Sequence, residues 1–258
     1  MKYPDTRLIR PSSPSFFKYG SLEHTERLKQ ILIDNQFYFS TQSQLNDPDE
    51  CLPIFSYDRP LEELLNYLCA VHLEENPNTT AARLEKIRED WRLKGKNRLI
   101  EEFGKIFINM FRDKTGILSL SMDGENTVLW AHYGDNHKGY CLEICNDPSI
   151  QCFEVIYDEK TPFEPSANLD ARSLEYLYTK QPAWSYEKEV RVIDVPGPKS
   201  FPPEWILSIT LGRYISKENK MKVLGWISRN PIQVTVKQAF YNESTQKLEY
   251  SVIDLTGI

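Results

Sequence analysis

The sequence contains no long hydrophobic run and no excess of positive charge. No apolar stretch among its 258 residues approaches the roughly 20 residues that a membrane-spanning helix needs. Residues 1–5 have neither an apolar core nor a small-residue cleavage site, which argues against a secretory signal. A formal net charge of -6 argues against a surface dedicated to duplex nucleic acid, which is usually basic. We therefore expect a cytoplasmic protein with no membrane partner.

Cysteine is also scarce, and its spacing is not that of a disulfide framework. An odd number of cysteines in this arrangement fits a reducing compartment. His132, His137, Cys141 and Cys145 lie close together in the sequence, as zinc ligands often do. However, Cys141 and Cys145 fall within one predicted strand, where four residues span roughly 13 Å, too far for two ligands of one ion. We expect no metal site and small buried thiols. The five cysteines are Cys51, Cys69, Cys141, Cys145 and Cys152.

Three common catalytic or nucleotide-binding motifs are missing. The chain has no G-x-G-x-x-G and no G-x-x-x-x-G-K-[ST], so neither a Rossmann domain nor a P-loop is supported. It also has no G-x-S-x-G, which argues against the serine nucleophile of an α/β-hydrolase. Any chemistry must therefore come from other residues.

The order of the predicted elements indicates an α+β fold. Strands do not alternate strictly with helices, as they would in a doubly wound parallel fold, so we expect mostly antiparallel sheets. The length permits one large domain, and we predict a single domain over residues 1–258. The segments that read as strands are 16–19, 37–40, 117–121, 140–145, 152–157, 190–195, 206–211, 232–236 and 248–253.

Residues 61–113 differ from the rest because apolar residues recur there at helical spacing. Asn76-Pro77-Asn78 interrupts the pattern, and Thr80 is placed to cap the helix that follows. We predict a helical insertion that packs outside the sheet. Further helices are expected from an N-cap at Ser21 to Asp34, over 126–133, over 167–180, and from a cap at Ser216 to Arg229.

The segment from Trp184 to Arg191 contains two glutamates, Glu187 and Glu189, at the entrance to a predicted strand. If the strand begins early enough, both carboxylates point to the same face. Two like charges at that distance raise the pKa of one carboxyl group, which suits acid–base or electrostatic work. The alternative is a solvated strand entrance where Glu187, Lys188, Glu189 and Arg191 pair with their neighbours.

Two further strand segments carry polar side chains. Lys18 and Tyr19 lie at the end of the first predicted strand. Ser119 and Ser121 lie two residues apart in another strand and so share a face. Each segment alone is a weak signal, but in chain order they place a cation, a pair of small hydroxyls and the two glutamates on three strands.

Two loop or helix segments allow both a functional and a structural interpretation. Asn46, Asp47 and Glu50 carry oxygens suited to a metal or an acceptor, although an Asx-turn before proline also explains the loop. The second segment either lines a cleft or anchors a buried helix. This segment is Trp130-Ala131-His132-Tyr133 with His137-Lys138-Gly139, and its candidate site residues are Trp130, Tyr133, His137 and Lys138.

These pieces resemble a bacterial domain-of-unknown-function family, numbered 2971. The resemblance begins near residue 16 and continues to the end of the chain. The family name carries no activity. The segments that carry the resemblance are 17–19, 39–50, 116–121, 129–140, 184–191 and 209–212.

The ordered cation, serine pair and two-glutamate segment is also similar to the pattern of mono-ADP-ribosyltransferases. This resemblance implies that Lys18 holds the dinucleotide NAD and that Ser119 and Ser121 brace the site. It further implies that Glu189 stabilises the ribosyl cation while Glu187 serves the acceptor. Position 18 departs from the pattern, because lysine cannot form the planar fork of an arginine. The aromatic residues that would stack on nicotinamide or adenine are Tyr19, Trp130, Tyr133 and Trp184.

The function implied by this resemblance is NAD-using ADP-ribosyl transfer or NAD glycohydrolysis, in a bacterial toxin or antiphage defence enzyme. Its partners would be an acceptor, macromolecular or small, and an inhibitor or defence-system protein. Two alternatives stay open. One is a non-catalytic module that binds nucleotide or nucleic acid. The other is a metal-dependent nuclease that uses the carboxylates near residues 46–50 and 187–189.

Overall fold

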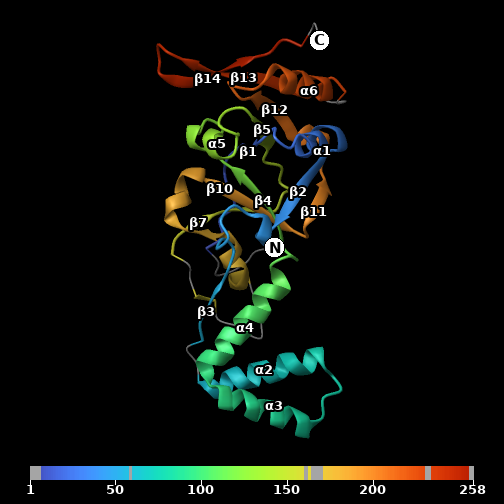
Figure 1. Cartoon of the computed structure of the whole chain (residues 1–258), viewed down its shortest axis with the longest axis vertical. Helices are drawn as coiled ribbons and strands as arrows, with labels where there is room; N and C mark the ends of the chain where they lie inside the picture. Colours follow the sequence, from blue (N-terminus) through green and yellow to red (C-terminus); the bar gives the residue numbers. More distant parts are fainter. Residues whose placement is uncertain (1–6, 58–59, 160–161, 164–170, 230–233, 256–258) are drawn as a thin grey trace.

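A ten-stranded sheet forms the centre of the computed structural model, which describes residues 7–57, 60–159, 162–163, 171–229 and 234–255 (Figure 1). One parallel pair joins two of its strands, and the other pairings between its strands in the described residues are antiparallel. The prediction of a mixed fold with a mostly antiparallel sheet is therefore confirmed. Eight strands lie in the order β11 (Gly197–Ser200), β2 (Gln36–Thr41), β4 (Gly116–Ser121), β1 (Ser15–Gly20), β5 (Tyr140–Cys145), β12 (Ile206–Leu211), β13 (Thr235–Asn242) and β14 (Lys247–Val252).

The remaining strands extend the sheet beyond β4 or form short pairs of their own. β10 (Glu189–Asp194) pairs along the length of β4, and β6 (Cys152–Glu154) pairs with β10. β12 and β13 make the parallel pair of the sheet. Two separate parallel pairs join β3 (Ile54–Phe55) to β8 (Pro162–Phe163) and β7 (Ile156–Tyr157) to β9 (Thr179–Lys180).

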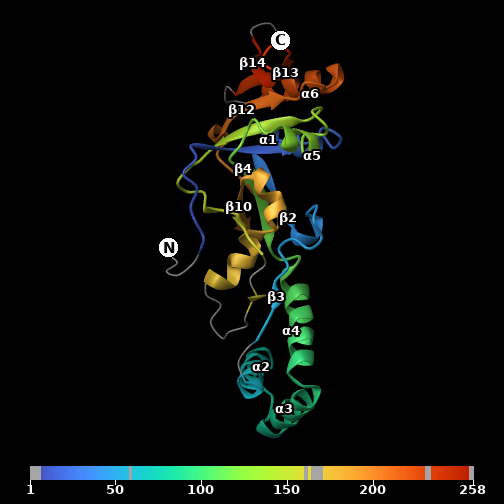
Figure 2. The ribbon, with the colours of Figure 1, turned by 90° about the vertical axis from the view of Figure 1, so that its left-hand side faces the viewer.

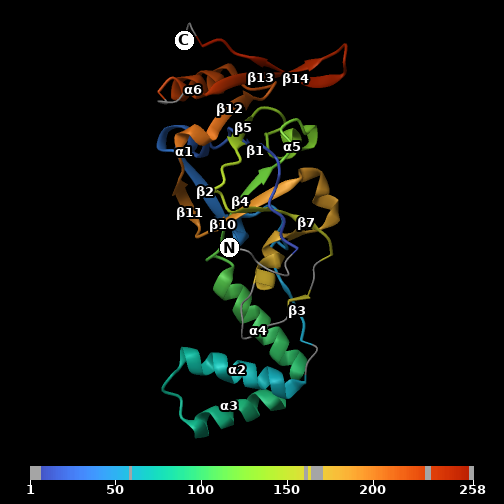
Figure 3. The ribbon, with the colours of Figure 1, turned by 180° about the vertical axis from the view of Figure 1, so that it is seen from behind.

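The two faces of the sheet differ in polarity. On one face Phe16 lies opposite Ile144, and both belong to the main apolar core. The helices α1 (Glu26–Asp34) and α6 (Lys217–Ile227) lie together over this face and complete the core (Figure 3). Because successive residues of a strand point to opposite faces, Phe17, Glu143 and Ser208 lie on the other face, which is polar.

Two of the three predicted N-cap residues, Thr80 and Ser216, are confirmed. The Ser216 hydroxyl accepts from the Asn219 N–H at the start of α6, and the Thr80 hydroxyl accepts from the Arg83 N–H. The prediction for Ser21 is wrong. Helix α1 begins at Glu26 after Thr25, and the Ser21 hydroxyl instead accepts from the N–H of Glu23 within the preceding turn.

The block over 61–113 forms three helices that project away from the sheet, as Figures 1 and 2 show. α4 (Lys96–Phe111) runs between the sheet and the two helices at the far end, α2 (Leu61–Glu75) and α3 (Ala81–Lys94). Leu64, Leu65 and Leu99 belong to a separate apolar cluster. The helices predicted in this block are confirmed, and they have a core of their own.

Several predicted boundaries need correction. A 3₁₀ helix over Ala171–Tyr178 and strand β9 replace the α-helix expected over 167–180, whose residues 167–170 lie outside the described residues. Another 3₁₀ helix covers Pro182–Glu187, so β10 begins at Glu189 and Glu187 precedes it. Of the strand expected over 232–236, residues 232–233 lie outside the described residues and β13 begins at Thr235.

The short helix expected over 126–133 is present as α5 (Thr127–His132). The side-chain oxygen of Asn126 caps it by accepting from the N–H groups of Val128 and Leu129. None of the helices in the described parts of the chain has both the length and the apolar character of a membrane span.

Candidate functional site

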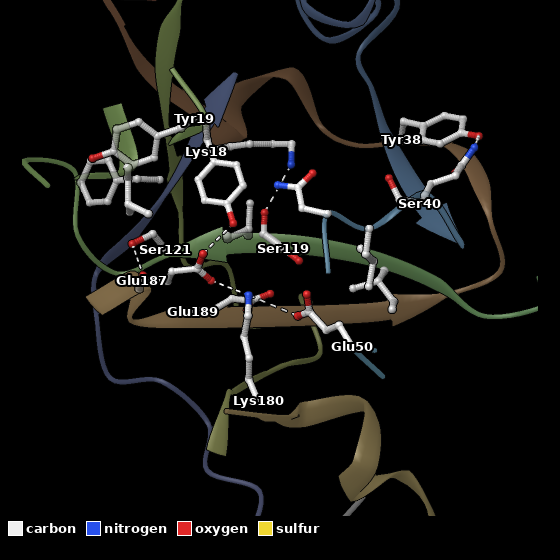
Figure 4. Close-up of a pocket in the computed structure, with 18 residues that line it drawn as sticks. Lys18, Tyr19, Tyr38, Ser40, Glu50, Ser119, Ser121, Lys180, Glu187 and Glu189 are labelled. Carbon is white, nitrogen blue, oxygen red and sulfur yellow. Dashed lines mark hydrogen bonds and ion pairs between the residues drawn. The ribbon is translucent and has the colours of Figure 1, made fainter. Parts of the chain in front are cut away.

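A cavity of 230 Å³ lies where three strands of the sheet part (Figure 4). β1 pairs with β4 only at Phe17 and Ser121, whereas β2 meets the other end of β4 at Ile117. The edge of β4 between these two points is therefore open. We call this space the split cavity. It brings together nine of the residues singled out from the sequence, namely Lys18, Tyr19, Asn46, Glu50, Ser119, Ser121, Tyr133, Glu187 and Glu189.

Three carboxylates converge on one ammonium group at the floor of the split cavity. The Nζ atom of Lys180 lies 2.5 Å from Glu187 Oε2, 3.1 Å from Glu189 Oε2 and 3.2 Å from Glu50 Oε1. Each of these four side chains is at least 92 % buried, since the exposed fractions are 4 % to 8 %. Together with Arg191 they form what we call the charge cluster. Three carboxylates and two cations leave one net negative charge in a place that water barely reaches.

Arg191 fixes the position of the Glu189 carboxylate by two hydrogen bonds. Its guanidinium is fully buried and donates from Nε to Glu189 Oε1 at 2.8 Å and from a second nitrogen to Oε2 at 3.0 Å. The same guanidinium also bonds to Glu50. Such a bidentate pair fixes the orientation of the carboxylate as well as its charge.

The environment of Glu189 differs from the sequence-based expectation. Burial by itself would raise its pKa, but the charge and hydrogen bonds of Arg191, followed by the charge of Lys180, hold the pKa at about 2. Burial instead raises the pKa of Glu50, against the opposing charge of Arg191. The alternative interpretation, a solvated strand entrance, is wrong, because Glu187 and Glu189 are each only 4 % exposed.

Glu187 is held on both carboxylate oxygens and at its backbone. The hydroxyl of Tyr133 donates to Oε1 at 2.6 Å, and Lys180 occupies Oε2. The hydroxyl of Ser121 donates to the carbonyl of Glu187 at 2.7 Å. Burial raises the pKa of Tyr133, so its phenol stays protonated and keeps this bond.

Lys18 and Tyr19 approach the split cavity from β1. The Lys18 Nζ atom donates to the carbonyl of Ser119 across the open edge of β4 at 3.3 Å. Burial lowers the Lys18 pKa to about 8, while the charge of Glu189 acts in the opposite direction. The hydroxyl of Tyr19 donates to the carbonyl of Asp123 at 2.9 Å. Lys18 is thus a cation near neutral pH that loses its charge at moderately alkaline pH.

Six of the residues singled out from the sequence do not line the split cavity, and four of them also lie away from the charge cluster, namely Asp47, Trp130, His137 and Lys138. Trp130 is fully buried behind Tyr19, whose ring meets it edge-on at 5.4 Å, and His137 stacks on it at 6.0 Å. The structure therefore favours the anchor interpretation of Trp130 over the cleft wall. Lys138 is exposed, and the Asp47 carboxylate accepts from the Asp49 N–H in the expected Asx-turn.

Trp184 contacts the charge cluster, and Arg191 belongs to it. The Trp184 ring lies 5.0 Å from the Lys180 ammonium, within cation–π range. Arg191 lies two residues beyond Glu189, on the same face of β10, and opposite Ser119. Neither residue lines the split cavity.

The sequence analysis missed Lys180 and Tyr157. Lys180 falls in a segment for which the sequence predicts an α-helix, and no motif surrounds it. The Tyr157 hydroxyl accepts from the backbone N–H of Glu189 at 2.7 Å. Tyr38 and Ser40 also line the cavity, and their alternation with the buried Phe37 and Phe39 was a signal that could have identified them.

The described residues contain no group of three His, Cys, Asp or Glu side chains that could hold a metal ion. In the charge cluster the carboxylates already surround the ammonium of Lys180. Four cysteines are buried and Cys145 is half-buried, and all five are free thiols. In β5, burial raises the pKa of Cys141 and Cys145.

A family model described as "Protein of unknown function (DUF2971)" matches residues 129–192. This segment contains Tyr133, Lys180 and two of the three glutamates of the charge cluster, Glu187 and Glu189, and the match supports the resemblance to this family noted from the sequence. Searches of curated proteins and of solved structures return no significant match.

Proposed function

We propose that the split cavity binds the nicotinamide end of NAD and breaks the bond between nicotinamide and ribose. One observation carries this proposal. Lys18, the pair Ser119 and Ser121, and Glu189 come from three segments far apart in the sequence, and all of them line the same cavity. Strand pairing is the reason, because Ser121 lies opposite Phe17 on one side and opposite Glu189 on the other.

The charge of the cluster suits this reaction. When the C1′–N bond breaks, its electron pair leaves with nicotinamide and positive charge develops on the ribose. A fixed carboxylate in a water-poor site stabilises that charge in the transition state. A pKa of about 2 keeps Glu189 ionised, and Arg191 keeps it oriented. The net negative charge of the cluster is therefore of the right sign and needs no rearrangement.

Glu187 is placed to serve the nucleophile. Water, in glycohydrolysis, or an acceptor, in transfer, forms the new bond to C1′ and must lose a proton. The Glu187 carboxylate, held by Tyr133 and Lys180, also lines the cavity near Glu189 and would take that proton. Lys18 would face the phosphates as a single charge without the fork of an arginine.

The size of the cavity limits which part of the ligand it holds. Small-molecule sites commonly enclose about 300–1,000 Å³, and the split cavity encloses 230 Å³. It therefore accommodates one end of a dinucleotide, with the remainder outside. Tyr19 and Tyr133 line the cavity and would contact the nicotinamide ring.

The geometry favours this function over a metal-dependent nuclease. A nuclease would need carboxylates free to bind the ion, but Glu50, Glu187 and Glu189 already surround Lys180. In the loop before them, Asp47 is occupied by its own Asx-turn. The role as a bacterial toxin or defence enzyme, with its partner proteins, rests on the resemblance alone and is tested by growth arrest on expression.

The direct test uses the purified protein and millimolar NAD. We expect NAD to raise the thermal midpoint, because a ligand that binds the folded state stabilises it, and nicotinamide to accumulate with time. Lys18→Ala should abolish the shift, while Lys105→Ala, an exposed lysine on α4, should preserve it. A shift without nicotinamide release would indicate a non-catalytic binding module. No shift with NAD but a shift with a divalent cation would favour the nuclease.

A further inference from the structure

One carboxylate oxygen of the charge cluster has no hydrogen-bond partner among the described residues. Both oxygens of Glu189 are bonded to Arg191, and both oxygens of Glu187 are also occupied. Glu50 is different, because Arg191 and Lys180 both bind its Oε1 atom. Its Oε2 atom makes no hydrogen bond or ion pair within the part of the chain that the structure describes (Figure 4). This oxygen is therefore available to hold a proton or to contact a ligand.

Glu50 lines the split cavity although its side chain is only 8 % exposed. It enters from the loop between β2 and β3, whereas Glu189 belongs to β10. The Nζ atom of Lys180 lies 3.2 Å from Glu50 Oε1 and 3.1 Å from Glu189 Oε2, so the two carboxyl groups are close neighbours. A ligand in the cavity would thus meet one carboxyl group that is bonded on both oxygens and another that has one oxygen to offer.

The excess negative charge of the cluster favours a proton on Glu50. Three carboxylates share two cations, and like charges raise the pKa of the carboxyl group that is stabilised least. Burial and the charge of Glu189 raise the pKa of Glu50, while Arg191 and Lys180 act in the opposite direction. At Glu189, by contrast, Arg191 and Lys180 outweigh burial and hold the pKa at about 2. Two carboxyl groups with pKa values displaced in opposite directions can serve as acid and as fixed charge in one reaction.

The cleavage of NAD makes no use of an acid at this position. The ring nitrogen of its nicotinamide is positively charged, so nicotinamide leaves as a neutral molecule and needs no proton. The base of a purine nucleotide differs, because it leaves as an anion unless one of its ring nitrogens is protonated. A general acid placed at the leaving group typically accelerates such a step by about 10²–10⁴. The available oxygen of Glu50 therefore fits an N-glycosidic bond whose leaving group must be protonated.

We propose that the split cavity also hydrolyses purine nucleoside 5′-monophosphates, with Glu50 as the general acid. The proton on Glu50 Oε2 passes to N7 of the purine, the C1′–N9 bond breaks, and its electron pair stays with the base. Water forms the new bond to C1′ and gives one proton to Glu187. The products are ribose 5-phosphate and the free purine, and proton exchange with the solvent restores both carboxyl groups. The inference rests on the proposed function only for Glu189, which stabilises the ribosyl cation in both reactions.

The size and lining of the split cavity fit a mononucleotide. Its volume of 230 Å³ accommodates one end of a dinucleotide, and a nucleoside monophosphate is such an end complete in itself. Tyr19, Tyr38 and Tyr133 line the cavity and supply aromatic surface for the base. Lys18 brings a single positive charge, which suits one terminal phosphate and does not require the planar fork of an arginine. The departure from arginine at position 18 thus agrees with a monophosphate.

The first test compares two substrates in the full chain. Hydrolysis of adenosine 5′-monophosphate (AMP) is followed as adenine release, and cleavage of NAD as nicotinamide release. We expect Glu50→Gln to lower adenine release at least about 10²-fold more than nicotinamide release, because only the adenine step consumes the proton. Glutamine keeps an acceptor for Arg191 and Lys180, and the thermal midpoint shows whether the variant folds. The matched control is Glu75→Gln, on an exposed residue at the end of α2 (Figure 1), which should leave the ratio of the two rates unchanged.

A second test needs only the wild-type protein and therefore holds even if Glu50→Gln does not fold. In 7-deaza-AMP a C–H group replaces N7, so the acid has no nitrogen to protonate there, and we expect hydrolysis at least about 10²-fold slower than that of AMP. Adenine release should also fall as the pH rises through the pKa of Glu50, since only the protonated group donates. The groups that face Glu50 are Lys180 of β9, Glu189 and Arg191 of β10, and Cys51, the next residue in the chain.

The outcomes separate this inference from the proposed function. Release of nicotinamide without release of adenine overturns the inference and leaves the proposed function standing. Equal rates with AMP and 7-deaza-AMP, or the same ratio of rates in Glu50→Gln and Glu75→Gln, overturn the role of Glu50. Release of adenine without nicotinamide supports the inference and contradicts the proposed function. If neither substrate is cleaved, both fail.

Discussion

Within the described residues, charged side chains gather in the charge cluster beside β10 and also across helices α2 to α4. In the helices, Glu62 bonds to Arg88 and Arg92, and Glu102 bonds to Lys94 and Arg98, all in contact with solvent. The helical pairs and the cluster use the same residue types at similar distances. In the cluster, however, every side chain is at least 92 % buried.

The difference in burial changes what each group does. Solvent screens exposed ion pairs, and ordering their long side chains offsets much of the attraction. Buried charges pay a large desolvation penalty and persist only when partners satisfy them. The ion pairs on the helices are therefore part of a solvated surface and contribute little to stability. The charge cluster is stabilised by its own partners and retains an excess carboxylate, which is why it is the candidate for chemistry.

The largest effect should come from removing the buried cation that holds two of the carboxylates. Arg191→Met leaves Glu189 and Glu50 without their guanidinium, and breaking a buried pair in this way typically destabilises a protein by about 3–5 kcal/mol. Denaturant unfolding measures the loss. The double variant Arg191→Met/Glu189→Leu should recover part of it. If Arg191→Met lowers the free energy of unfolding no more than the removal of an exposed ion pair on the helices does, the charge cluster and the helical pairs do not differ in their contribution to stability.

The next effect concerns rate. Glu189→Gln removes the charge that faces the ribosyl cation while preserving shape, and losing such a group typically lowers the rate by about 10²–10³. Nicotinamide release measures this loss of rate. Glu187→Gln should reduce transfer to the acceptor more than hydrolysis, because attacking water can also pass its proton to the solvent, whereas a bound acceptor depends on Glu187. Because Glu189 is buried, we also expect a lower thermal midpoint. Wild-type rates in both variants, with intact folding, would make the pair structural.

Tyr133→Phe is a milder variant at the same site and keeps the experiment informative if Glu189→Gln fails to fold. It removes one hydrogen bond to Glu187 and leaves the ion pairs intact. We expect a smaller decrease in rate with little change in stability, measured by the same two assays. An unchanged rate would show that the position of Glu187 does not matter for catalysis.

A pH effect should distinguish Lys18 from the exposed lysines. Its pKa is lowered to about 8, so Lys18 is protonated below that pH and loses its charge as the pH rises through it. The affinity for the anionic dinucleotide should fall over that interval. Calorimetric titration at several pH values measures the change. Lys18→Arg should remove the pH dependence because arginine stays charged, and a flat profile in the wild-type protein would contradict the role of Lys18.

The smallest effect is expected on the helices. Glu62→Gln removes the partner of Arg88 and Arg92, but all three side chains contact water. We expect little change in the thermal midpoint and none in nicotinamide release. A decrease as large as that of Arg191→Met would show that the exposed network is as important for stability as the charge cluster.

Local patterns in the sequence were sufficient for much of the fold. The strands over 117–121, 140–145 and 206–211 were predictable because their residues alternate or form short apolar runs, and such periodicity reflects burial directly. The helical block was predictable for the same reason. Ser21 shows the limit, since an N-cap residue type does not guarantee a cap when a turn takes up its hydroxyl.

The sequence by itself also determined which segments carry the cation, the serine pair and the glutamates, because side-chain type and residue spacing are local properties. Only the tertiary structure decided that these strands part at one cavity, that Arg191 and Lys180 hold the pKa of Glu189 low, and that Glu50 and Lys180 join the site. Lys180 is seven residues from Glu187 in the chain but 130 residues from Glu50, and contacts over such separations depend on how the strands and loops pack. Burial and charge partners, which set the chemistry of a carboxylate, are properties of that packing.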